Sequence, residues 1–187
     1  MTPRRIDRVQ IADPVGGRAL AEVIAGAQTR TMNFDQCRLT PELRDALLRE
    51  QNECTVAWTN AQGWPVAVVQ TYVWAQGAFW ITAFRDKPRV GALAAKPQAA
   101  VVVSSKGTDV GPEKMLSARV TATLLDDAAT QEWFYPAFAA RAVSDPGAIA
   151  GFAKILGRQD RVIIRLDPVS WTTFDGVLLR APRAKPA

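Results

Sequence analysis

The sequence of 187 residues has a formal net charge of +5, two cysteines and no histidine. A chain of this length forms one domain with a full hydrophobic core, and Cys37 and Cys54 are too few for a disulfide framework. The lack of histidine excludes Ser–His–Asp and Cys–His catalysis and every His-ligated zinc, iron or haem site, and we predict no metal site. No apolar run approaches the roughly 18 residues of a membrane-spanning helix, and the start lacks the apolar core of a signal peptide, so we expect a cytoplasmic protein.

The first 40 residues are predicted to form an N-terminal arm. Residues 1–17 contain Arg, Pro and Gly, and residues 18–27 are rich enough in alanine for a short helix. A clearer helix is predicted over residues 41–52, because Thr40 is a good N-cap and Pro41 suits the first helical position. We therefore divide the chain into an arm (1–40), a folded domain (41–180) and a basic tail (181–187).

The hydrophobic pattern then changes from the period of a helix to that of strands. Strands are predicted over residues 54–59, 66–74, 79–82, 99–104 and 116–125. The turn residues Ala75-Gln76-Gly77 predict a tight hairpin between the second and third of these. A short helix begins near Asp86, and residues 106–115 form a loop.

The last third of the sequence is predicted to hold two helices before the closing strands. Asp126 and Asp127 form the expected N-cap pair of a helix through Trp133 that Pro136 should end or kink. The second helix runs from an Asp145 N-cap to a Gly157 C-cap. The last strands are expected at 162–166 and 170–174, with Asp175-Gly176 before residues 177–179. Six or seven strands with few helical crossovers favour a mainly β, antiparallel barrel.

The excess positive charge lies at the two ends of the chain. Residues 1–8 contribute +2 and residues 180–187 contribute +3, so residues 9–179 are neutral overall. Nucleic-acid-binding domains usually carry a basic stripe on the folded body. We therefore expect neither a nucleic acid nor a membrane as a partner.

A local cationic cluster stands out inside the neutral body. Arg85, Lys87 and Arg89 lie at the start of the helix predicted near Asp86. Helices normally carry acidic residues there, and each misplaced cation costs about 0.3–1 kcal/mol. A bound phosphate would reverse the sign of that interaction, since backbone N–H groups and cations would converge on it. The alternative interpretation is three solvated surface charges.

This segment, in its context, resembles a known superfamily. The succession of a strand, NAQGWP, VAVVQTYVW, QGAFWIT, R-D-K-P-R-V-x-x-L-x-x-K-P and AVVVS is similar to the pyridoxamine 5′-phosphate oxidase-like, FMN-binding split barrels. The resemblance covers residues 54–125, and residues 162–175 are compatible with the closing strands. It implies an antiparallel split β-barrel of Greek-key type with flanking helices, forming a homodimer with two FMN sites at the subunit interface.

The resemblance also implies which residues bind the cofactor. They are Val68, Gln70, Thr82, Arg85, Lys87, Arg89 and Trp171. Arg89 matches the lysine of the family's K-x-x-x-L element, and Arg85 and Lys87 fall within its phosphate turn. Thr82 would bond phosphate or ribityl oxygen.

The second strand would run beside the flavin ring. Val68 lies on this strand, and Gln70 could reach a ring heteroatom, although a solvent-facing position is the alternative for Gln70. Trp171 is the candidate for packing near the flavin, with core or interface packing as its alternative.

The lack of histidine also limits the function that the resemblance implies. Genuine pyridoxamine phosphate oxidases close their substrate site with a C-terminal motif containing Arg and His, which is absent here. Three hypotheses remain: an FMN-dependent oxidoreductase that transfers a hydride to or from a small organic substrate, a deazaflavin-dependent reductase, and a flavin-binding protein without turnover. No catalytic acid or base is identified, and a proton could come from water, Tyr72 or Tyr135.

Overall fold

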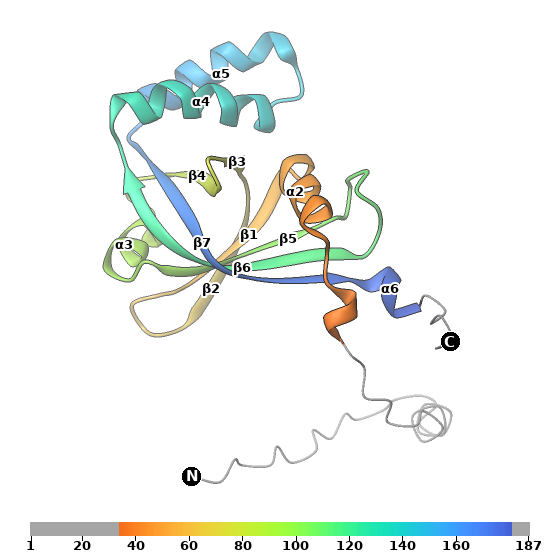
Figure 1. Ribbon diagram of the computed structural model, residues 1–187. Helices are drawn as coiled ribbons and strands as arrows, with labels where there is room; N and C mark the ends of the chain where they lie inside the picture. Colours follow the sequence, from red (N-terminus) through yellow and green to blue (C-terminus); the bar gives the residue numbers. More distant parts are fainter. Residues whose placement is uncertain (1–33, 181–187) are drawn as a thin grey trace, which may run out of the picture. The chain divides into compact units, whose positions relative to one another are not determined.

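Residues 34–180 are described by the computed structural model in Figure 1. The predicted segments at 1–17, 18–27 and 181–187 lie outside these described residues. Among the helices within 34–180, none is long and apolar enough to cross a membrane.

Seven antiparallel strands form one curled sheet in the order β2-β1-β5-β6-β7-β4-β3 (Figure 1). They are β1 (Glu53–Thr59), β2 (Pro65–Thr71), β3 (Val73–Ala75), β4 (Ala78–Phe84), β5 (Gln98–Ser104), β6 (Lys114–Leu125) and β7 (Arg161–Asp175). The predicted mainly β, antiparallel split barrel with flanking helices is confirmed.

The curl of the sheet follows from the predicted run 66–74, which divides at Tyr72. The part before Tyr72 pairs with β1 at one edge of the sheet, and the part after it pairs with β4 at the other edge. One residue therefore joins the two edge strands, which forces the sheet to curl. The hairpin after β3 turns through Gln76 and Gly77 at φ 53° and 72°, as a tight two-residue turn requires.

The closing strand differs from its prediction because a bulge replaces a break. Strand β7 is continuous over the two predicted segments 162–166 and 170–174. Its pairing with β6 shifts so that Arg119 faces Ser170 while Val120 faces Pro168. Val169 is left without a partner in this register, which is the geometry of a β-bulge. The chain thus accommodates Pro168 without ending the strand.

Helices flank the sheet. They are α2 (Pro41–Glu50), α3 (Pro88–Ala95), α4 (Ala128–Ala142), α5 (Pro146–Arg158) and α6 (Gly176–Arg180), preceded by the 3-10 turn η1 (Phe34–Cys37). The predicted caps are confirmed: Thr40, Asp127 and Asp145 each accept a backbone N–H of the first turn. Residues 177–179 lie in α6 and not in a strand.

Two predicted helix ends, the one before Pro136 and the C-cap at Gly157, are wrong, while a kink at Pro136 stays a prediction. Helix α4 continues through Pro136 to Ala142, because Pro136 lies on the exposed side while Phe134 and Phe138 pack beneath the helix. Water can then satisfy the carbonyl that proline leaves unpaired. Gly157 lies inside α5, where a Cβ would meet the ring of Tyr135 at 3.7 Å, and Gln159 is the C-cap.

Strand β4 is buried on both faces, and this double burial positions the candidate site. Phe79 and Ile81 point into the barrel core, whereas Trp80 points outward to a second core with Phe134 and Ile163. The second core is covered by the paired helices α4 and α5, which stand together at one side of the sheet (Figure 1).

Candidate functional site

The cationic turn connects β4 to α3. The chain leaves β4 at Phe84, and the backbone N–H of Lys87 bonds to the carbonyl of Phe84 at 3.1 Å. Lys87 is the N-cap of α3, it makes no side-chain cap, and the first turn has no acidic residue. The first backbone N–H groups of α3 therefore have no side-chain acceptor from their own helix.

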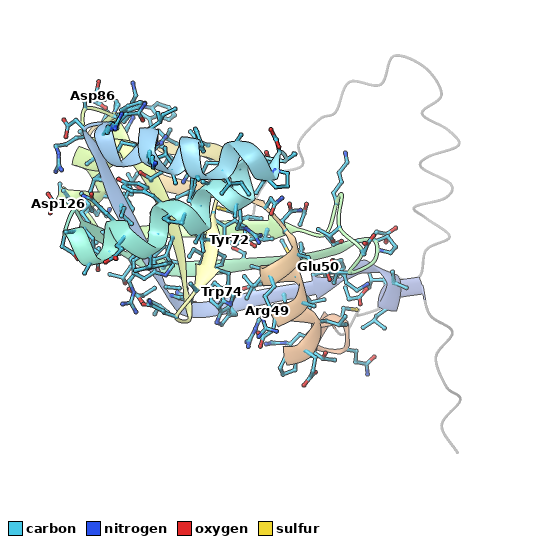
Figure 2. All side chains as sticks on the ribbon, turned by 90° about the horizontal axis from the view of Figure 1, so that it is seen from above. Arg49, Glu50, Tyr72, Trp74, Asp86 and Asp126 are labelled. Carbon is cyan, nitrogen blue, oxygen red and sulfur yellow. The ribbon has the colours of Figure 1, made fainter. Side chains whose placement is uncertain are left out.

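Arg85 is held by two aspartates. Its Nε donates to Asp160 Oδ1 at 2.9 Å and a terminal nitrogen donates to Asp126 Oδ2 at 3.2 Å. The bond to the Asp160 carboxylate raises the pKa of Arg85. Figure 2 places Asp86 and Asp126 at the same end of the domain. The role of Arg85 as a phosphate ligand stays a prediction.

Lys87 is half-exposed beside the turn. Its Nζ lies 3.9 Å from Asp86 Oδ1 and 5.8 Å from the centre of the Phe84 ring. This separation from the carboxylate, with both groups in water, makes a weak interaction. Lys87 can therefore turn toward a ligand at little cost.

Arg89 is partly buried on the first turn of α3. One terminal nitrogen reaches the backbone carbonyl of Thr82 at 3.5 Å, and its Nε is buried with no hydrogen-bond partner among the described residues. Burial lowers the pKa of Arg89. Thr82, also buried, donates its hydroxyl to the carbonyl of Val162 at 3.0 Å.

A fourth cation, Arg161, was not predicted from the sequence. It is the first residue of β7, lies opposite Phe84 in the sheet, and stacks on that ring at 4.3 Å. Its Nε donates to Thr82 Oγ1 at 3.2 Å. Only the pairing of β4 with β7 brings Arg161 to the turn. The sequence gives no local signal for it, because that register cannot be read from neighbouring residues.

The two candidate proton donors have different surroundings. Tyr72 is fully buried, donates its hydroxyl to the carbonyl of Leu48 at 2.9 Å, and has its pKa raised by burial. Tyr135 lies by Thr82 and Arg161; burial raises its pKa, and the charge of Arg161 opposes this. Both side chains are almost entirely shielded from solvent, so neither presents its hydroxyl to a substrate in this structure.

Val68 and Gln70 lie on the inner side of the edge strand β2. Val68 packs against the barrel core, and Gln70 alternates onto the same side, whereas Val69 is 64% exposed on the outer side. The solvent-facing alternative for Gln70 therefore does not describe its amide, because Nε2 is buried. That nitrogen has no hydrogen-bond partner among the described residues.

An open groove lies between the start of β2 and helix α3. Its volume is about 730 Å³, and its walls include Val66, Pro88, Gly91 and Ala92. A groove of this size is in the range of small-molecule sites. One of its walls, Pro88, lies between Lys87 and Arg89 in the sequence, and another, Val66, is on the same strand as Val68.

Trp171 lies on β7, ten residues after Arg161. It packs between Trp74 and Phe79 at ring distances of 6.0 and 5.9 Å, with the Arg44 guanidinium 5.3 Å above it; Figure 2 labels Trp74 on this side. Phe79, the β4 residue that it contacts, lies five residues before Phe84 at the turn, which is about 17 Å along an extended strand. The role of Trp171 beside the flavin stays a prediction.

Comparisons with known proteins agree with this architecture. A conserved hypothetical protein, Rv2991, from Mycobacterium tuberculosis superposes with a TM-score of 0.68 at 12% identity, over 85% of this chain and 98% of that chain. An F420 reductase gives 0.52 at 20% identity over 68% and 94%, and an FAD-binding protein from Mesorhizobium loti gives 0.53 at 14% over 72% and 94%. At these identities the likeness is one of fold.

The sequence comparison identifies the family. No curated protein sequence matches this chain. The profile of the pyridoxamine 5′-phosphate oxidase family, however, matches residues 39–175, from just before α2 to the end of β7. This match takes in well over half of the chain and every strand described above, so the protein belongs to the pyridoxamine 5′-phosphate oxidase family.

Proposed function

We propose that the protein is a homodimeric oxidoreductase that binds FMN and transfers a hydride to or from a small organic substrate. One observation carries the proposal. Three buried side-chain nitrogens lack a hydrogen-bond partner among the described residues, and two of them belong to Gln70 and Arg89, which the family resemblance assigns to the cofactor. Buried donors without acceptors are costly and rare, so both positions favour a ligand that supplies acceptors.

The residues present fit a flavin phosphate. Lys87 and Arg89 would hold the phosphate at the start of α3, and the groove beside Pro88 leads to β2. There Gln70 Nε2 would donate to an acceptor on the ring edge, and Val68 would offer apolar contact. A bound flavin supplies the hydride chemistry. Because Tyr72 and Tyr135 are shielded, we infer that the proton comes from water.

The second subunit has a specific role in this proposal. The family resemblance implies flavin sites at the subunit interface, so in this proposal Trp171 contacts the flavin held by the turn of the other copy. An oxidoreductase with an interface site then requires the dimer for cofactor binding. Analytical ultracentrifugation with and without FMN tests this, and a monomer that binds FMN fully would contradict it.

A deazaflavin-dependent reductase is the second candidate. The F420 reductase among the structural neighbours favours it, since the same phosphate turn would serve both cofactors. Titration of the purified protein with FMN and with the deazaflavin cofactor separates the two. A protein that binds a flavin yet reduces and oxidises nothing would support the third hypothesis, binding without turnover.

The first experiment is the visible spectrum of the purified protein, followed by release and mass determination of any chromophore. The double variant Lys87→Gln/Arg89→Gln should then lose FMN while keeping its circular dichroism spectrum. Lys154→Gln, an exposed cation on α5, is the control for loss of charge. Unchanged FMN binding in the double variant would refute the phosphate assignment.

Gln70 offers a test with two opposite readouts. Gln70→Leu removes a buried unpartnered amide, so the cofactor-free protein should gain up to about 1 kcal/mol in unfolding free energy. The same change should weaken FMN binding by about tenfold, since one ring hydrogen bond is lost. Chemical denaturation without cofactor and fluorescence titration measure the two effects. If stability falls and FMN affinity stays the same, Gln70 has a structural role.

A further inference from the structure

Two arginines from different elements meet at Thr82. Arg89, from α3, reaches the Thr82 backbone carbonyl, and Arg161, from β7, reaches the Thr82 hydroxyl. The further contacts of Arg161 are neutral as well: its guanidinium donates to Gln159 Oε1 at 3.1 Å and lies on the Phe84 ring. Within residues 34–180, neither arginine forms an ion pair with a carboxylate.

The two guanidinium groups are close enough to repel each other. Burial lowers the pKa of Arg161, the neighbouring Tyr135 opposes this, and the positive charge of Arg89 adds a smaller lowering. Burial likewise lowers the pKa of Arg89. Two partly buried like charges without a counterion destabilise the site. A dianion placed between them would remove the repulsion and satisfy the unpartnered Nε of Arg89.

Arg85 differs from this pair because its charge is already neutralised. Asp126 follows the end of β6 and Asp160 precedes β7, so the two carboxylates flank the helices α4 and α5. By binding both, Arg85 ties the two ends of this helical insertion together. The backbone N–H of Arg85 also bonds the carbonyl of Asp160 at 3.1 Å. Arg161, the next residue, is held in place by this contact.

We propose that Arg161 completes the phosphate site: Arg89 and Arg161 form a two-arginine clamp beside Thr82 that binds a phosphomonoester, and Arg85 positions Arg161 without binding the phosphate. The proposal rests on the proposed function, since the phosphate is that of the flavin. Guanidinium groups suit this ligand because each presents a planar pair of donors to phosphate oxygens.

The test compares FMN with riboflavin, which has the same ring and ribityl chain but no phosphate. Arg161→Gln should weaken FMN binding by about 10- to 100-fold, as expected for a hydrogen-bonded charge, and leave riboflavin affinity unchanged. Arg165→Gln is the matched control, because Arg165 is on the same side of β7 but is paired with Asp167 at 2.8 Å. It should change FMN affinity less than threefold.

The possible failures are distinguishable. If wild type binds FMN and Arg161→Gln retains its preference for FMN over riboflavin, the clamp is overturned while the proposed function stands. Equal loss of FMN and riboflavin affinity would also overturn it, since the effect would not involve phosphate. If wild type binds neither flavin, calorimetry with inorganic phosphate decides: binding lost in Arg161→Gln supports the clamp alone, and no binding overturns both proposals. Should Arg161→Gln fail to fold, Arg161→Lys must lower the FMN-to-riboflavin affinity ratio.

Discussion

Thr82 allows a quantitative test of the polar contacts that hold the end of β4 to the start of β7. Its hydroxyl is buried, donates to the Val162 carbonyl at 3.0 Å, and accepts from Arg161 Nε at 3.2 Å. Thr82→Val keeps the β-branched shape and the strand propensity but removes both bonds. The substitution therefore isolates the hydroxyl from the side chain's shape.

The expected magnitude follows from the two bonds. A neutral hydrogen bond contributes about 0.5–1.5 kcal/mol and one to a charged group about 1.5–3. Because Arg161 is partly solvated, its share lies at the lower end, about 1.5 kcal/mol, and the extra methyl group of valine returns up to about 0.8 kcal/mol. We therefore expect Thr82→Val to lower the free energy of unfolding by about 1–3 kcal/mol.

Guanidinium denaturation followed by tryptophan fluorescence measures the change, at fixed protein concentration in a buffer without phosphate or sulfate. These anions must be absent because any ligand of the native state adds stability. Thr82→Ser is the control, since it keeps the hydroxyl and loses only one methyl group. If Thr82→Val is as stable as the wild type, or more stable than Thr82→Ser, the hydroxyl does not link these strands and the reasoning is wrong.

Three further predictions concern stability elsewhere in the domain. Lys114 and Asp175 form a buried ion pair at 3.4 Å, so Lys114→Met should lower the free energy of unfolding, measured with urea, by about 3–5 kcal/mol because the Asp175 charge is left unpaired. The double variant Lys114→Met/Asp175→Asn should recover part of this loss. Gly77→Ala should destabilise by about 1 kcal/mol or more because φ is +72°, whereas Gly91→Ala, in a helix with open space for a Cβ, should raise the melting temperature. Burial raises the pKa of Cys54 from 9.0 to about 12, so between these two pH values the thiol ionises in the unfolded chain and stays protonated in the folded one. The free energy of unfolding of the wild type should therefore fall by up to about 1.4 kcal/mol more per pH unit than that of Cys54→Ala, and equal slopes would contradict this.

Features set by neighbouring residues could be predicted from the sequence. The three N-caps and the hairpin at Gln76-Gly77 follow from local hydrogen bonding and backbone geometry, and all are present in the structure. The wrong helix ends depend instead on distant partners. Pro136 is tolerated because the aromatic residues of α4 pack onto β4, and Gly157 lies within α5 beside the Tyr135 ring. Nothing adjacent in the sequence indicates those contacts.

The same distinction holds for the candidate site. The cationic turn was visible as a local anomaly, three cations where a helix favours acids. The sequence did not show that Arg85 is paired with carboxylates while Arg89 is not. Asp126 and Asp160 approach Arg85 only through the pairing of β6 with β7 and of β7 with β4. Arg161 was missed for the same reason: 72 positions separate it from Arg89 in the sequence.

The placement of carboxylates determines which cation remains for a ligand. Four cations and three aspartates surround the turn: Arg85, Lys87, Arg89 and Arg161 with Asp86, Asp126 and Asp160. Two of the carboxylates bind Arg85 and the third lies near Lys87, so none is left for Arg89 and Arg161. Residues 9–179 are neutral overall, yet unequal pairing concentrates unneutralised positive charge at Thr82. Overall charge therefore argues against a broad basic surface without excluding a phosphate site, because a bound dianion responds mainly to charges within the screening length of about 8–10 Å.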